Sequence, residues 1–156
     1  MKKILIAILT LALALTGLTA CGKKGAAKDV DLSEFWSQLE SEIELPGMIE
    51  NSDELISYYP GLEEITLTQS VIKVPMMTAV VNEYVFLQCE NEEDAAKAAE
   101  ILQTRVSQQA DGGAWYPASV EAWSKAQVVT NGTYVAMVAA GDDTQAVVDK
   151  FNALFA

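Results

Sequence analysis

A strand–strand–helix pattern occurs twice in this chain, and it constrains the fold more than any other feature. An apolar run at residues 84–87 leads to acidic residues and then to a helical pattern that includes Ala96. A second run at residues 134–137 leads in the same way to a helix with Ala146. Two such units can pair as one antiparallel sheet whose apolar face is covered by helices. The sequence therefore predicts an α+β fold with about four strands and with helices packed mainly on one face.

The individual elements follow from hydrophobic periodicity and turn residues. Residues 31–44 carry one apolar stripe at helical spacing, and a shorter helix is expected over 52–59. We expect these N-terminal helices to pack on an edge of the sheet or on the same face as the others. The remaining expected elements are strands over 65–74, 78–90, 127–130 and 133–140, and helices over 91–110 and 142–154, with a short helical piece before Lys125.

Turn and cap residues support these boundaries. Asp31 and Asn91 stand where an N-cap is needed, and Asp142 with Gln145 gives a capping pattern for the last helix. Asn131-Gly132 between two strands is a strong hairpin signal, because both residues tolerate a positive φ. Pro75 is expected in a turn or at a bulge, since proline cannot donate to a sheet ladder.

The amino-terminal segment has the features of a targeting signal. Two lysines precede an uncharged apolar run, and small residues follow it, as in a secretory signal. Residues 18–21 (Leu-Thr-Ala-Cys) resemble the lipobox of bacterial lipoproteins. The resemblance implies a signal peptide over 1–20, cleavage between Ala20 and Cys21, and fatty acyl chains such as palmitate on Cys21. The alternatives are an ordinary signal peptide and an uncut membrane helix, for which the 15-residue run is short.

The rest of the chain then consists of a tether and one domain. Residues 21–30 include small residues and three lysines, have no apolar period and are expected to form a lipidated tether, and residues 31–156 suffice for a single domain. We therefore expect the protein to be lipid-anchored at the extracytoplasmic face of the cell membrane. The formal net charge of −12 argues against nucleic acid as a partner, since phosphates require a basic surface.

Residue types exclude several chemistries. The chain has no histidine, which removes Ser-His-Asp and Cys-His catalysis and the usual zinc sites. If Cys21 carries lipid, Cys89 has no cysteine with which to form a disulfide. Its apolar surroundings favour a buried thiol over a reactive one. Acidic clusters at helix starts are explained by capping, although an ion site is the alternative. We assign no catalytic residue, cofactor or metal.

A set of short motifs follows one another along residues 36–151. The motifs, in order, are Leu45-Pro46 with Met48, residues 82–85, residues 92–95, Arg105-Val106 with Gln109, Tyr116-Pro117 and residues 132–135. Together they resemble a bacterial family known only as a domain of unknown function, DUF4358. The resemblance implies short lipoproteins, mostly of Gram-positive bacteria, with no activity or catalytic residues to transfer.

Four residues form a candidate binding surface. Trp115, Tyr116 and Trp123 could present aromatic rings to a ligand, or they could close an edge of the core. Arg105 could clamp a carboxylate, or it could pair with an acid of the same chain. We expect a non-enzymatic module that interacts with another protein of the cell envelope. The alternative is a lipoprotein that binds a small ligand or peptide in a cleft near Trp115 and Tyr116.

Overall fold

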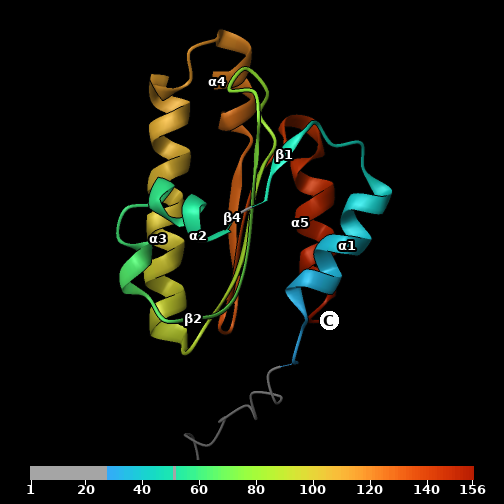
Figure 1. Cartoon of the computed structure of the whole chain (residues 1–156), viewed down its shortest axis with the longest axis vertical. Coiled ribbons are helices and arrows are strands. Elements are labelled where there is room, and N and C mark those ends of the chain that lie inside the picture. The colour runs from blue at the N-terminus through green and yellow to red at the C-terminus, as the bar shows by residue number, and fades with distance from the viewer. Residues whose placement is uncertain (1–27, 51) are drawn as a thin grey trace, which may run out of the picture.

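The computed structural model describes residues 28–50 and 52–156, and in these residues one antiparallel sheet stands between two layers of helices (Figure 1). The strand order is β1-β2-β3-β5-β4. The α+β class is thus confirmed, with five strands in the described residues where about four were expected. The strands are β1 (Met48–Ile49), β2 (Leu67–Pro75), β3 (Glu83–Cys89), β4 (Gln127–Asn131) and β5 (Tyr134–Ala139).

The additional strand is β1, which has only two residues and pairs Met48 with Pro75 and Ile49 with Val74. A pair of residues is too short to show an alternating pattern, so sequence periodicity could not reveal it. The same pairing places Pro75 at the end of β2 rather than in the expected turn. The irregularity in the register of β2 lies instead between Leu67 and Gln69.

Helices and short helical turns alternate with these strands. The expected helices are present, with ends that differ by a few residues from the predicted ones. They are α1 (Leu32–Glu42), α2 (Ser52–Leu55), α3 (Glu92–Gln108), α4 (Pro117–Ser124) and α5 (Thr144–Ala153), with short turns η1 (Ile56–Tyr58), η2 (Leu62–Glu64), η3 (Gln109–Gly113) and η4 (Gly141–Asp143).

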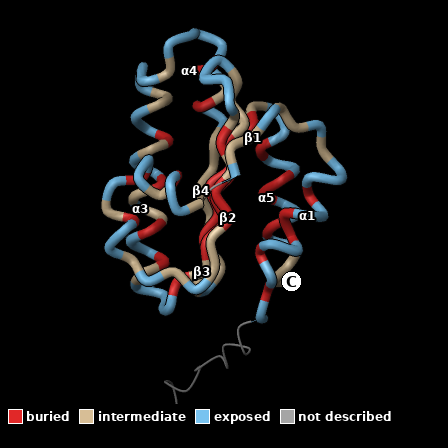
Figure 2. The backbone as a smooth tube through the Cα atoms, viewed as in Figure 1, coloured by how far each residue is buried: buried red, intermediate tan, exposed pale blue. Residues whose placement is uncertain are grey.

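The helices cover both faces of the sheet, and the expectation of helices mainly on one face is wrong. Val85 and Leu87 of β3 pack under α3 in one core, whereas Tyr84 and Phe86 pack with α1 and α5 in the other. Figure 2 shows buried residues along the sheet and on the inward sides of the flanking helices. The reason lies in the strands, since β5 is buried at every position and needs cover on both sides.

The two strand–strand–helix units therefore do not repeat each other in space. Val85 and Val135 face the same core, as a two-fold axis normal to the sheet would require. That axis would also place α3 and α5 on one face, but they lie on opposite faces. The chain departs from the repeat after β5, where Gly141 has a φ of 56° and α5 begins on the other side.

Capping residues explain where two helices begin. The carboxylate of Asp31 accepts hydrogen bonds from the amides of Ser33 and Glu34, each at 2.9 Å. The Asn91 side chain accepts from the amide of Asp94 at 2.9 Å. The cap expected for the last helix is wrong, because Asp142 instead pairs with Lys125 at 2.7 Å.

The β4–β5 hairpin is confirmed, with its turn one residue later than expected. Asn131 pairs with Tyr134, so the two loop residues are Gly132 and Thr133. Of these two residues, Gly132 has a positive φ, 59°, and Thr133 does not. This fits a type II′ turn, in which glycine takes the first loop position.

Candidate functional site

The four residues predicted as a binding surface fall into two groups. Trp115 is 92% exposed and Tyr116 is 56% exposed, so both rings stand at the surface. Trp123 is 5% exposed and belongs to the core beneath α3. Arg105 lies against Trp123, with its guanidinium carbon 5.4 Å from the ring centroid. The structure thus brings Arg105 and Trp123 together and separates them from the exposed rings.

Local backbone structure explains why the Trp115 side chain is exposed to solvent. At the end of α3 the chain turns through η3, where Gly112 has a φ of 107° that disfavours other residues. Trp115 and Tyr116 follow this turn, and Pro117 then starts α4 at a position that suits its fixed φ. The two rings are therefore held between two helix ends.

A second exposed apolar loop lies beside this one. Met76 is 69% exposed and Met77 is 64% exposed, in the connection between β2 and β3. The hydroxyl of Ser119, in the first turn of α4, donates to the carbonyl oxygen of Ala79 in that connection at 3.3 Å. We call Met76, Met77, Trp115 and Tyr116 the distal surface.

This surface lies at the end of the fold opposite to the point where the described chain begins. The amide of Val30 donates to the Tyr134 hydroxyl at 3.0 Å, at the start of β5. The loop with Met76 and Met77 leads into the other end of β3, at Glu83, which pairs with Ala139. The seven residues of β3 separate the two ends by about 20 Å (Figure 1).

Arg105 neutralises a buried carboxylate. Glu83 is 3% exposed, and it accepts from Arg105 Nε at 3.1 Å and from Nη2 at 2.9 Å. The hydroxyl of Tyr59 donates to the same carboxylate at 2.9 Å. A bidentate pair with a third donor satisfies a buried acid well. Of the two readings of Arg105, pairing within the chain is the one present.

The titration behaviour of this cluster reflects its burial. Desolvation raises the pKa of Tyr59, and the negative charge of Glu83 raises it further. Burial by itself lowers the pKa of Arg105, but the hydrogen bond and charge of Glu83 more than reverse this effect. Tyr59 is therefore neutral and Arg105 is charged at any physiological pH. The cluster holds its protons firmly and suits a structural role.

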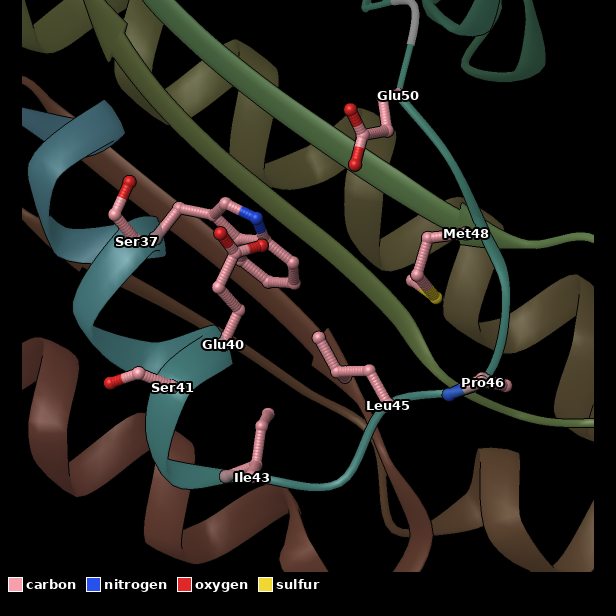
Figure 3. Close-up of a pocket in the computed structure, with 9 residues that line it drawn as sticks. Ser37, Glu40, Ser41, Ile43, Leu45, Pro46, Met48 and Glu50 are labelled. Atoms are coloured by element: carbon pink, nitrogen blue, oxygen red, sulfur yellow. The ribbon is translucent and has the colours of Figure 1, made fainter.

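A groove runs between α1 and the segment that leads into β1 (Figure 3). Its volume is about 550 Å³, within the range of small-molecule sites. An adjoining hollow of about 330 Å³ continues toward β2, and the two share Trp36, Ser37, Glu40 and Glu50. The family motif Leu45-Pro46 with Met48 lies along this groove, but the motif by itself did not indicate a binding site.

Two polar groups of this groove are poorly satisfied. Trp36 is 5% exposed, and its buried Nε1 has no hydrogen-bond partner within the part of the chain that the structure describes. An unpaired buried donor costs about 1–3 kcal/mol. Lys73 Nζ stands 5.3 Å from the Trp36 ring centroid, and it forms an ion pair with the exposed Glu50 at 3.6 Å. Lys73 Nζ therefore keeps hydrogen-bonding capacity toward the groove, whereas Trp36 Nε1 is an unpaired donor buried beneath the groove surface.

Cys89 is buried in the core beneath α3, as expected. Burial raises the pKa of its thiol to about 11, with a further contribution from Asp94. The thiol is therefore protonated at neutral pH and is a poor nucleophile.

Two features are absent from residues 28–50 and 52–156. No group of three or more acidic, histidine or cysteine side chains there could hold a metal ion. No helix there is long and apolar enough to span a bilayer. The predicted cleavage site at Ala20 and Cys21, and most of the tether, lie outside the described residues.

Comparison with known proteins gives one match. No curated protein and no solved structure matches the chain. Residues 41–140, which are 100 of the 156 residues, match the domain of unknown function DUF4358. This segment includes β1 to β5, Glu83, Arg105 and the distal surface, and it leaves out Trp36 and α5. Because the match covers more than half of the sequence, the chain belongs to the DUF4358 family.

Proposed function

We propose that the chain is an extracytoplasmic lipoprotein, anchored through Cys21, that docks onto another protein of the cell envelope without catalysis of its own. The observation that carries the proposal is the exposure of Trp115 and Tyr116, and of Met76 and Met77 in the connection that Ser119 joins to α4. Aromatic residues and methionine are enriched at protein interfaces, where they act as anchors. Trp115 is 92% exposed, and an exposed group of large apolar side chains is typical of an interaction site.

The point at which the predicted tether enters the fold supports the same proposal. The predicted tether enters the fold at Val30, at the end opposite to the distal surface. An anchor at Cys21 would hold the Val30 end near the bilayer and would turn Trp115 away from it. The exposed rings would then face other envelope proteins rather than the lipid.

The alternative of a small-ligand or peptide site near Trp115 and Tyr116 is less well supported. Such a site would enclose its aromatic rings, since ligand pockets bury most of their ligand. Trp115 instead has 92% of its surface exposed. A protruding ring suits insertion into a partner better than enclosure of a ligand.

The first test is site-specific photo-crosslinking in intact cells. A photoreactive phenylalanine analogue is placed at Trp115 or, as a control, at the exposed Ala153 near the opposite end of the fold. We expect one discrete crosslinked product from position 115 and none from position 153. Replacing Tyr116 with serine should weaken that product, and equal crosslinking from both positions would contradict the proposal.

The anchor needs a separate test. Labelling with a palmitate analogue and membrane fractionation are compared for the unmodified chain and for Cys21→Ala. We expect the label and the membrane association to disappear in Cys21→Ala, together with the crosslink from position 115. Retention of the label in that variant would overturn the proposed lipidation, and retention of the crosslink would separate docking from anchoring.

A further inference from the structure

The groove between α1 and residues 43–50 brings three kinds of chemistry together. No residue of the distal surface lines it, although the Met76 amide donates to the carbonyl oxygen of the neighbouring Gly47. The floor of the groove carries hydrogen-bond donors, its two sides carry carboxylates, and one end is apolar. The lining residues on which the inference rests are Trp36, Glu40, Leu45, Met48, Glu50 and Lys73.

The floor requires a hydrogen-bond acceptor. The indole N–H of Trp36 is buried and unpartnered in the described part of the chain, and Lys73 Nζ lies over the same ring. Lys73 has a side chain that is only 13% exposed, so its ammonium group is largely removed from water. Both groups are donors only, so a carbonyl oxygen suits either; it can accept from Lys73 Nζ directly, and from the buried Trp36 Nε1 once the side chains that cover the indole move aside.

The two sides of the groove favour a cation. Glu40 projects from α1, and Glu50 projects from the segment after β1 on the opposite side, with both carboxylates turned into the groove (Figure 3). These two charges exceed the single positive charge of Lys73. An ammonium group placed between them would gain two charge-assisted hydrogen bonds.

The remaining end of the groove is apolar. Ile43 and Leu45, from the connection between α1 and β1, and Met48, the first residue of β1, lie along this end (Figure 3). All three are only partly buried by their own chain, so an added aliphatic side chain would cover them.

From this arrangement we infer that the groove binds the amino terminus of a peptide whose first side chain is aliphatic. The ammonium group lies between Glu40 and Glu50, and the first carbonyl oxygen accepts from Trp36 Nε1 and Lys73 Nζ. The first side chain packs on Leu45 and Met48. An amino terminus is the simplest ligand that carries these three groups on adjacent atoms.

Three small probes separate these contributions. Leucinamide carries the ammonium group, the carbonyl and the side chain, whereas N-acetyl-leucinamide lacks the charge and isopentylamine lacks the carbonyl. Binding to the full chain in detergent is followed through the indole N–H signals in ¹H–¹⁵N NMR spectra. The signals of Trp36 and Trp115 are assigned from the variants Trp36→Phe and Trp115→Phe.

We expect leucinamide to shift the Trp36 indole signal saturably and to leave that of Trp115 unchanged. The acetylated probe should bind at least tenfold more weakly, and isopentylamine should bind without the large Trp36 shift. Leu-Gly-Gly-amide should bind more tightly than leucinamide if the natural ligand is a peptide. Equal affinity of those two would indicate a free amino-acid derivative instead, and would overturn the peptide assignment.

Matched variants test the role of the carboxylates. Glu50→Gln should weaken leucinamide binding several-fold. Glu44→Gln makes the same charge change at an exposed residue outside the groove and should have no effect. Equal effects of the two variants would overturn the inference, as would the absence of a saturable Trp36 shift. Crosslinking from position 115 would be unaffected by either result, so the two proposals fail separately.

Discussion

Each face of the sheet carries a tryptophan with a cation over its ring, and the two pairs differ in what else the cation contacts. Arg105 lies 5.4 Å from the Trp123 centroid and makes two hydrogen bonds to the buried Glu83. Lys73 lies 5.3 Å from the Trp36 centroid, and its ion pair is with an exposed carboxylate. The same local contact therefore belongs to a closed network on one face and to an open groove on the other.

This difference distinguishes side chains that only stabilise the fold from side chains that can still bind a ligand. A buried ion pair with every group satisfied has nothing left to offer a ligand, and removing one member leaves an unpaired buried charge. A cation at the edge of a groove, beside an unpaired N–H, can exchange partners at little cost. The comparison predicts that equivalent substitutions in the two pairs have very different effects.

The largest effect is expected from Arg105→Met. This change keeps an aliphatic stem over Trp123 but leaves the carboxylate of Glu83 buried with Tyr59 as its remaining donor. Loss of one member of a buried pair should lower the free energy of unfolding by about 3–5 kcal/mol. Urea denaturation followed by circular dichroism measures it, and a loss below about 1 kcal/mol would show that Glu83 is not held as an ion.

The control is the double variant Arg105→Met with Glu83→Leu. Replacing a buried ion pair with apolar residues of similar volume is often neutral, because both desolvation costs disappear. We expect this variant to recover most of the stability lost in Arg105→Met. If the double variant is less stable than the single one, the packing of Arg105 matters more than its charge.

A smaller effect is expected from Tyr59→Phe. The variant keeps the buried ring and removes the hydroxyl that donates to Glu83 at 2.9 Å. A hydrogen bond to a charged group contributes about 1.5–3 kcal/mol, so the loss should lie in this range. Thermal unfolding measures it, and adding Tyr59→Phe to the double variant should then cost much less, because its acceptor is absent.

Sequence patterns predicted the elements of the fold better than their layering. Strands and helices were found because periodicity and caps such as Asp31 and Asn91 act locally. The layering was wrong, although the uninterrupted apolar run at residues 84–87 carried a signal for it. A strand with one solvent-exposed face alternates apolar and polar residues, whereas a strand covered on both faces is apolar throughout.

The candidate sites were predicted less well, for a different physical reason. Glu83 lies 22 residues before Arg105 and 24 residues after Tyr59, and nothing local distinguishes it among the 22 acidic residues. Trp36 fitted the apolar stripe of its helix, so its unpaired N–H could not be foreseen. Trp115 and Trp123 looked alike in sequence, and only the turn at Gly112 and the position of Trp123 in α4 separate them.

The smallest effect is expected from Lys73→Met, the counterpart of Arg105→Met on the other face. The methionine keeps an aliphatic stem beside Trp36 and leaves behind only Glu50, whose side chain is 72% exposed and therefore stays solvated. An ion pair with an exposed carboxylate contributes less than about 1 kcal/mol and a cation–π contact about 0.5–2 kcal/mol, so the free energy of unfolding should fall by about 1–2 kcal/mol. Denaturation under the conditions used for Arg105→Met gives the direct comparison. A loss of 3 kcal/mol or more would mean that Lys73 is as deeply committed to the fold as Arg105, and that the donors of the groove are not available to a ligand.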